Sequence, residues 1–236
     1  MLRVVLKLDG EKVVDADVVI GYLHRGIEKL SEHRDYTQIV MLTDRMDYCA
    51  SAAANLGYCE TVEKLMSLEV PRRARYIRTA LAELQRIASH LVWVGSHAMD
   101  IGAVTVFLYA LRERELILDL FEEFCGARLT YNSMRIGGVP QDIPPGWDKR
   151  VLKFCDIMDE KIAEYETLLT HNRIWLERTR GIGVISGADA VAIGLSGPPL
   201  RASGVRRDVR KDEPYAAYSE FTFDIPLGTN GDTYDR

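Results

Sequence analysis

The common sequence signatures of nucleotide-binding and hydrolytic enzymes are missing from this chain of 236 residues. It contains no G-x-G-x-x-G, P-loop, H-E-x-x-H or G-x-S-x-G motif. These absences speak against a dinucleotide-binding fold, a P-loop NTPase, a common zinc protease and a serine hydrolase. The five histidines are scattered without a metal-ligand spacing. The chemistry therefore has to be sought in isolated polar residues.

Long hydrophobic runs and paired cysteines are also missing. No run reaches the roughly 18 apolar residues of a membrane-spanning helix. The opening MLRVVLKLDG meets charged residues too early for a signal peptide. We therefore expect a protein that is cytosolic or peripheral on a membrane. The four cysteines form no C-x-x-C pair and lie in apolar helical contexts, which indicates reduced core thiols.

Neither sign of charge dominates the composition. Thirty Lys and Arg residues stand against 35 Asp and Glu residues, so the net charge of -5 gives no general reason to expect nucleic-acid binding. Two stretches, residues 72–86 and 201–211, are locally basic. Each indicates either a solvated face or a docking surface for an acidic partner.

Hydrophobic periodicity divides the chain into an N-terminal β-hairpin region (1–23), a central helical bundle (24–180) and a partial α/β region (181–236). The predicted fold class is mainly α with α+β parts. The valine-rich runs LRVVLKL and KVVDADVVI flank Asp9-Gly10, which is a hairpin turn signal. Helical spacing predicts helices near 24–34, 47–67, 72–99, 104–125 and 148–178.

Turn-forming residues predict the remaining segments. Gly126 is a helix stop, and the Gly- and Pro-rich residues 131–147 form a long irregular loop. A short helix is expected near 187–193 and strands near 218–225. The ending GTNGDTYDR has no closing element, so we expect the last region to be incomplete.

The stretch DRMDYCAS, residues 44–51, places unusual polar groups at the expected start of a helix. Tyr48 follows Arg45 by three residues, so both can face one side of a first helical turn. A phenol donates a hydrogen bond without being charged, and arginine supplies a fixed positive charge that favours a developing anion. Asp100, at the far end of the third helix, could orient a histidine. A cap, a surface pair or a buried hydrogen bond remains the alternative for each residue taken alone.

Long sequence runs resemble one protein family along essentially the whole chain. They are IGYLHRGIEKL, DRMDYCAS, VPRRARYIRTALAELQRIASHLVW, SHAMDIGAVTVFLYALRERE, RIGGVPQDIPPGW, LLTHNRIWLERTRGIGV and GDTYDR. The chain resembles the 49-kDa-type subunit of bacterial NADH–quinone oxidoreductase, respiratory complex I. The resemblance implies a fold like the large subunit of nickel–iron hydrogenases, without the nickel site.

The resemblance also implies partners and a function. In that family the 49-kDa-type subunit packs against the subunit carrying the terminal iron–sulfur cluster, and the two form the quinone headgroup site. Other peripheral-arm subunits and a membrane subunit at the quinone channel complete the surroundings. We expect proton-translocating NADH:quinone oxidoreductase activity in the complex, at the cytoplasmic face of the cell inner membrane. NADH and the clusters belong to partner subunits; this chain is expected to bind no metal and no cofactor of its own.

Matched residue by residue, Tyr48 corresponds to the family tyrosine that hydrogen-bonds the quinone headgroup. Arg45 corresponds to an arginine near the terminal cluster, and Asp100 to an acid that partners a headgroup-binding histidine. That histidine belongs to an HPxxHG loop that precedes the first hairpin in the family and is absent here, as is the family's C-terminal part. We therefore expect the chain alone to be inactive in quinone reduction.

One departure from the family concerns Thr130. The chain has GARLT where many members have GARMH, and the histidine there titrates with the redox state of the cluster. A threonine cannot carry that charge, which leads to the hypothesis of a lower cluster potential and a low-potential quinone such as menaquinone. A pH-dependent, high-potential terminal cluster in a redox titration would contradict it.

Two alternatives stay open at this point. One is a subunit of a related membrane-bound, hydrogenase-like complex, which nickel in the purified complex would indicate. The other is a truncated, non-catalytic docking scaffold.

Overall fold

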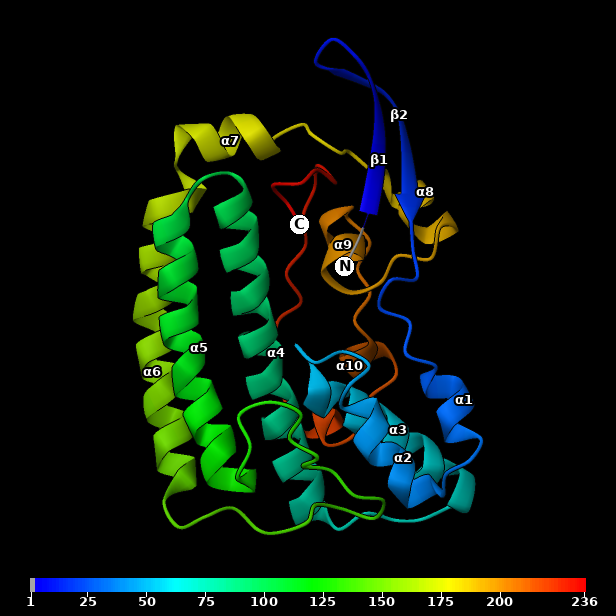
Figure 1. Ribbon diagram of the computed structural model, residues 1–236. Helices are drawn as coiled ribbons and strands as arrows, with labels where there is room; N and C mark the ends of the chain where they lie inside the picture. The colour runs from blue at the N-terminus through cyan, green and yellow to red at the C-terminus, as the bar shows by residue number, and fades with distance from the viewer. Residues whose placement is uncertain (1–2) are drawn as a thin grey trace.

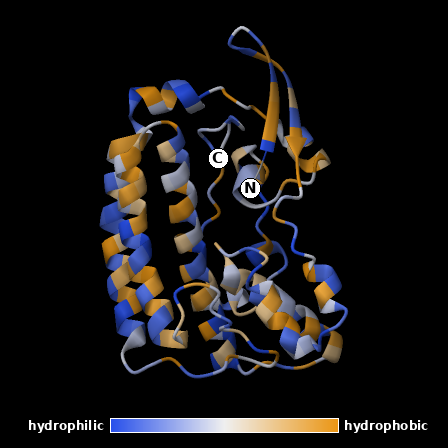
Figure 2. Ribbon diagram, in the orientation of Figure 1, coloured by the Kyte–Doolittle hydropathy of each residue, from blue (hydrophilic) through white to orange (hydrophobic). Residues whose placement is uncertain are grey.

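The N-terminal hairpin predicted from the valine-rich runs is confirmed. The computed structural model describes residues 3–236, in which β1 (Arg3–Asp9) pairs antiparallel with β2 (Lys12–Val19). Gly10 has φ 61°, the left-handed conformation that the tight turn requires. The hairpin projects from the rest of the molecule, and both strands carry hydrophobic residues (Figures 1 and 2).

Helices make up most of the remaining chain, which confirms the fold class. The first six are α1 (Ile27–Ser31), α2 (Tyr36–Thr43), α3 (Ser51–Met66), α4 (Arg72–Asp100), α5 (Val104–Cys125) and α6 (Trp147–Tyr165). The long helices α4, α5 and α6 stand side by side as a bundle (Figure 1). Helix α3 packs against α4 near one end of the bundle, and α2 packs against α3. Gly95 lets α4 approach α5 closely, because a Cβ there would lie 3.2 Å from the Phe107 side chain.

The core of the bundle consists of the apolar stripes that periodicity predicted. Leu81 and Ala88 of α4 face Ile117 and Phe121 of α5, and all four are essentially unexposed. The ring of Phe121 stacks on Tyr131 at a centroid distance of 3.8 Å. Each large buried side chain contributes about 1.5–3 kcal/mol. This packing fixes the loop after α5, which Tyr131 belongs to, against the C-terminal part of α5.

The continuous helix predicted over 148–178 is wrong. After α6 the chain forms one π-helical turn, Glu166–Thr170, and leaves helical geometry at His171 and Asn172. A new helix, α7 (Arg173–Thr179), then crosses the end of the bundle (Figure 1). The Asn172 side chain accepts hydrogen bonds from the backbone N–H groups of Ile174 and Trp175, so it starts α7 as an N-cap.

Replacing Asn172 with alanine is expected to lower the free energy of unfolding by about 1 kcal/mol, because two N–H groups at the start of α7 lose their acceptor. Urea unfolding measures this. Asn172→Ser, which can still accept, is the control and should keep most of the stability. Equal losses in both variants would contradict the capping role.

The C-terminal region contains short helices and loops. These are α8 (Gly187–Ala192), α9 (Gly197–Ala202), α10 (Val209–Asp212) and a 3-10 turn (Tyr218–Glu220). The strands predicted near 218–225 are wrong: within residues 3–236 the only sheet is the hairpin. Isolated backbone hydrogen bonds hold the extended segments instead, such as Ile185 N to Gly231 O at 2.9 Å. These isolated hydrogen bonds do not form the continuous ladder that a β-sheet requires.

Two further sequence predictions concern irregular segments. Gly126, with φ 77°, ends α5 as expected. Residues 131–146 lack helix and strand apart from one isolated bridge between Arg135 and Gly138. Among the helices of the described residues, none combines the length and apolar character needed to cross a membrane.

Candidate functional site

Arg45 and Tyr48 lie in the connection between α2 and α3, not in the first turn of a helix as the sequence suggested. Helix α3 begins only at Ser51. The Asp47 carboxylate accepts a hydrogen bond from Cys49 N (3.1 Å), and Asp47 O accepts from Ala50 N (3.0 Å). This local bonding holds the chain in turns and delays the helix. Residues 44–50 are called the Tyr48 turn below.

The Tyr48 turn is held from beneath by buried side chains. Gln85 of α4, which is 1% exposed, donates to Cys49 O at 2.6 Å. Ser51, also buried, donates through its hydroxyl to Asp44 O at 3.0 Å. The Tyr48 side chain itself is exposed. The result is a phenol presented to the outside on a turn whose backbone is tied to the bundle.

Arg45 stabilises the same turn while remaining exposed. Its Nη1 donates to Met41 O at 2.7 Å, near the end of α2, and the Arg25 guanidinium contacts Arg45 O. A cation at a helix C-terminus is favourable because the last carbonyls are unpaired. Arg45 is therefore fixed beside Tyr48 by its contact with α2.

Asp100 is not brought to the Tyr48 turn. It is the exposed last residue of α4, fifteen positions after Gln85, which holds the turn. At 1.5 Å per residue this separation is about 22 Å along the helix axis. Within residues 3–236, Asp100 has no side-chain hydrogen bond and no histidine partner. Tyr48 and Asp100 thus occupy separate parts of the fold.

Thr130 lies closer to the Tyr48 turn. It is half-buried and has φ 50°, a conformation that is unfavourable for a β-branched residue. Two residues later, Asn132 N donates to the carboxylate of Asp44 at 2.6 Å. The first part of the loop after α5 is therefore bound to the Tyr48 turn, and Thr130 lies shortly before that contact.

Asp44 is the residue that sequence reasoning missed. It is fully buried, and burial, which outweighs its hydrogen bonds and the nearby arginines, raises its pKa from 3.8 to about 6. The only sequence signal is an aspartate directly after the apolar end of a helix. Such a residue resembles an ordinary C-terminal neighbour of a helix, so nothing singled it out.

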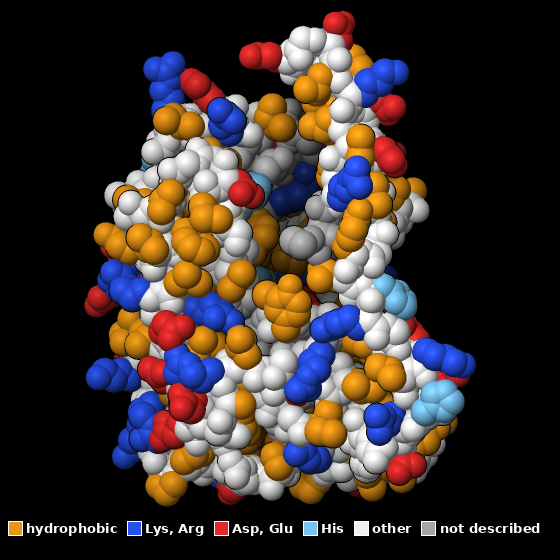
Figure 3. All heavy atoms as spheres, viewed as in Figure 1, with side chains coloured by type: hydrophobic (Ala, Val, Ile, Leu, Met, Phe, Trp, Pro, Cys, Tyr) orange, Lys and Arg blue, Asp and Glu red, His pale blue; other side chains and the backbone are white. Residues whose placement is uncertain are grey.

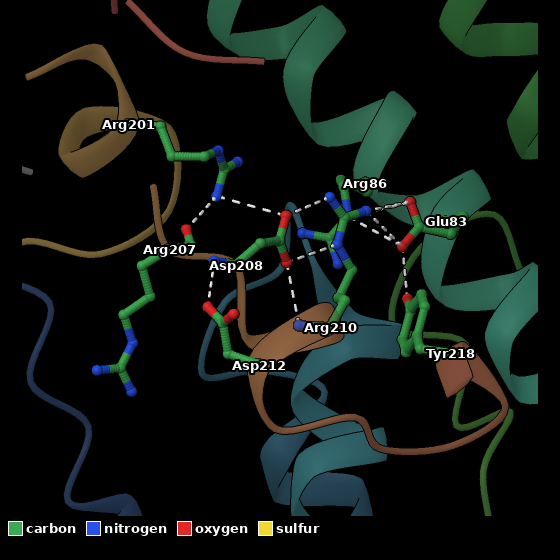
Figure 4. A network of polar contacts seen from close by, with 8 residues as sticks. All are labelled: Glu83, Arg86, Arg201, Arg207, Asp208, Arg210, Asp212 and Tyr218. Atoms are coloured by element: carbon green, nitrogen blue, oxygen red, sulfur yellow. Dashed lines mark hydrogen bonds and ion pairs between the residues drawn. The ribbon is translucent and has the colours of Figure 1, made fainter. Parts of the chain in front are cut away.

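The two basic stretches are largely neutralised within the chain. Arg72 and Arg75 pair with Glu220, Arg73 with Asp142, Arg78 with Glu63, and Arg86 with Glu83. In the second stretch, Arg201 and Arg210 both bind Asp208 (Figure 4). The prediction of docking surfaces is therefore weakened, because these charges have acidic partners inside the molecule.

One network joins the two basic stretches. Arg210 reaches the Glu83 carboxylate of α4 at 3.2 Å, and the Tyr218 hydroxyl donates to the same carboxylate at 2.5 Å (Figure 4). Despite its burial, Glu83 has a lowered pKa because the Tyr218 hydroxyl and the Arg86 and Arg210 guanidinium groups favour its charged form. The network fastens the C-terminal region to the middle of α4.

A cavity of about 1080 Å³ opens between α4 and the segment 191–236. Its lining includes Arg86 and His90 of α4 together with Leu200, Arg207 and Leu227. Figure 3 shows the molecule hollowed between the bundle side and the hairpin side. Burial, aided by Arg86, lowers the pKa of His90, which favours the neutral imidazole. None of Arg45, Tyr48, Asp100 and Thr130 lines this cavity.

Residues 3–236 contain no group of three or more His, Cys, Asp or Glu side chains arranged to hold a metal ion. Cys59 is buried, and burial raises the pKa of its thiol to about 11, which favours the protonated thiol.

The family model and the relatives that match this chain all describe a subunit of NADH dehydrogenase or NADH-quinone oxidoreductase. A family model described as "Respiratory-chain NADH dehydrogenase, 49 Kd subunit" matches residues 100–236. Over the whole chain, identity is 55% to an NADH-quinone oxidoreductase subunit of Thermodesulfovibrio yellowstonii and 54% to one of Campylobacter concisus. Identity to the corresponding NADH-quinone oxidoreductase subunit of Bacillus cereus is 52%, again over the whole chain.

The chain covers 59%, 58% and 64% of these three relatives, respectively, so it spans about three fifths of their length. The family model covers more than half of the chain, and the identities extend over the N-terminal part that the model does not match. The chain therefore belongs to the family of the 49-kDa subunit of respiratory-chain NADH dehydrogenase.

Proposed function

We propose that this chain forms one wall of a quinone-reduction site in a proton-translocating NADH–quinone oxidoreductase. The observation that carries the proposal is the Tyr48 turn. It presents an exposed phenol and an exposed guanidinium, while buried Gln85 and Ser51 fix its backbone. The relatives, which are all named as NADH-quinone oxidoreductase subunits, support the assignment to such a complex.

Tyr48 is the proposed ligand of the quinone headgroup. A quinone carbonyl accepts hydrogen bonds, and a phenol donates one at neutral pH without losing its proton. As the quinone gains electrons its oxygens become basic, so the same phenol can pass a proton to them. A turn anchored at both Cys49 O and Asp44 O keeps the hydroxyl in place, which hydrogen-bond geometry requires.

Arg45 is proposed to act on the terminal iron–sulfur cluster of a partner subunit. A fixed positive charge favours an added electron on a nearby group. Electrons would come from NADH through clusters on partner subunits, and this chain would supply the positions of Arg45, Tyr48 and Thr130 at the last step. With Thr130 unable to titrate, we keep the proposal that the quinone is a low-potential one such as menaquinone.

Asp100 is proposed to act at a different place on the same wall. Its position at the exposed end of α4 suits a partner that comes from another segment or chain, such as the histidine of the family's HPxxHG loop. We place the assembly at the cytoplasmic face of the bacterial membrane, where the remaining peripheral-arm subunits and a membrane subunit would contact this chain.

Purification of the tagged protein from native membranes tests the proposal. We expect iron–sulfur subunits and a membrane subunit to copurify, with iron and no nickel in the same sample. Nickel would move the protein to a hydrogenase-like complex. Recovery of the chain with no metal and no partners would favour the non-catalytic scaffold and overturn the proposal.

A further inference from the structure

Unpartnered buried polar atoms gather beneath the Tyr48 turn. Seven buried side-chain nitrogen or oxygen atoms within residues 3–236 have no hydrogen-bond partner. Apart from Arg75 Nε, they are Asp44 Oδ1, Asn55 Oδ1, Gln85 Oε1, Arg114 Nε, Tyr131 OH and Ser133 Oγ. Buried polar groups are normally paired, so a set of unpaired ones in one region calls for a cause.

Asp44 is the only carboxyl in this set, and it joins two segments. Its Oδ2 accepts from Asn132 N at 2.6 Å, and its main-chain oxygen accepts from the Ser51 hydroxyl at 3.0 Å. Its Oδ1 accepts nothing. Asn55 lies beside the carboxyl, but it donates its amide to Val40 O and Thr43 Oγ1. Only Oδ2 of the carboxylate therefore has a hydrogen bond within the described residues, although the neighbouring Asn55 side chain also favours the charged form.

Glu63 is a second buried carboxylate that binds the same loop, but it has a counterion. It accepts from Gly137 N at 2.7 Å, as Asp44 does from Asn132 N. Arg78 then pairs with both Glu63 oxygens, at 2.9 and 2.6 Å. No salt bridge of this kind reaches Asp44 within the described residues. A buried charge without a counterion favours proton uptake.

Among the charged and titratable groups around Asp44, Asp44 itself is the one that changes its protonation state near pH 6. Arg45 and Arg135 lower its pKa, but their guanidinium groups donate to carbonyls of Met41 and Asn132. Burial raises the pKa of the Cys125 thiol, and it raises the pKa of Tyr131 to about 12. Both therefore stay neutral between pH 5 and 8, and the nearby Arg114 guanidinium only partly offsets the effect of burial on Tyr131.

We propose that Asp44 is a positioning residue whose proton latches the Tyr48 turn to residues 131–135: the contact is tight when the carboxyl is neutral and loosened when it is ionised. The inference rests on the proposed function in so far as the latch positions Tyr48 for quinone. Opening the contact would let water reach the carboxyl and return its pKa from about 6 toward 3.8. The form in which the Tyr48 turn contacts residues 131–135 therefore binds the proton more tightly than the form in which this contact is broken. Raising the pH through 6 favours breaking the contact.

Hydrogen–deuterium exchange in the purified complex measures the latch directly. After correction for intrinsic exchange, opening of the peptide that contains Asn132 should increase about tenfold between pH 5 and pH 8 in the wild type. Asp44→Asn has nearly the same shape and stays neutral, so it should remove this pH dependence. At pH 8 it should exchange about 150-fold more slowly than the wild type, and at pH 5 about 15-fold more slowly, because the open form of the wild type is already ionised at pH 5.

Asp119→Asn is the matched control, because Asp119 is an exposed carboxylate on α5 whose partner Arg128 also binds Glu115 and Glu122. It should keep the wild-type pH dependence. A wild-type peptide whose corrected opening does not change between pH 5 and 8 would overturn the proposal, and this result needs no variant. An Asp44→Asn variant with the same pH dependence as the wild type would overturn it as well.

The pH profile of quinone reduction gives the second readout. In the wild type, the rate of quinone reduction should change with pH around pH 6. Asp44→Asn should remove this change with pH. If Asp44 were merely structural, its replacement would alter the rate at every pH and leave the change around pH 6 in place. If the complex does not reduce quinone at all, the proposed function fails. The exchange result would still decide whether Asp44 is a latch.

Discussion

Replacing Arg78 with methionine is expected to lower the free energy of unfolding by about 3–5 kcal/mol. Arg78 is 1% exposed and forms both salt-bridge contacts with Glu63, which is itself buried. It also donates to Gly138 O at 3.0 Å and to Arg135 O at 2.5 Å. Methionine fills much of the volume but leaves the Glu63 charge and two loop carbonyls without partners, and that imbalance is the source of the loss.

Denaturant unfolding measures this effect, and two further variants separate its causes. Arg73→Met removes an exposed pair with Asp142 and should cost much less, because solvent screens an exposed ion pair. The double variant Glu63→Gln/Arg78→Met removes both charges and should recover part of the stability. If Arg78→Met cost no more than Arg73→Met, the buried pair would not be what fixes the 131–138 segment to α3 and α4.

The parts of the fold that could be predicted are those with local causes. Asp9-Gly10 between valine-rich runs determines the hairpin, and three- to four-residue spacing determines α4 and α5. Helix α2 was missed because only eight residues carry its pattern. The break at Asn172 was missed because the apolar period continues across it, while a capping side chain decides where α7 begins.

The burial of Arg78 could not be predicted for a different reason. Five arginines between 72 and 86 look alike in sequence, and only their neighbours from distant segments distinguish them. Arg78 meets Glu63 of another helix, and Arg75 and Arg72 meet Glu220 near the other end of the chain. Which arginine is buried is therefore a property of tertiary packing.

The residues of the candidate site also fall into those that could be predicted from the sequence and one that could not. Arg45 and Tyr48 were found because the family resemblance marked them, and the structure adds how their turn is held. Asp44 was passed over because its chemistry arises from burial and from one oxygen without a donor. A sequence shows that a carboxylate is present; only the packing around it decides whether it keeps its charge.

Replacing Tyr48 with phenylalanine in the assembled complex is expected to lower quinone reduction by about 10²-fold or more, the typical effect of losing a positioned proton donor. The loss should leave NADH oxidation by an artificial acceptor intact, because that reaction bypasses the quinone site. The Tyr48 side chain is exposed, and phenylalanine keeps the ring, so folding and assembly should not change. Both activities are measured on the same membranes.

Tyr36→Phe provides the matched control, since Tyr36 is an exposed tyrosine on neighbouring α2 whose hydroxyl has no hydrogen bond within residues 3–236. It should retain both activities. Normal quinone reduction in Tyr48→Phe would remove the phenol from the mechanism. Equal loss of both activities would instead trace the role of Tyr48 to assembly, because a hydroxyl that acts only on quinone cannot slow a reaction that avoids it.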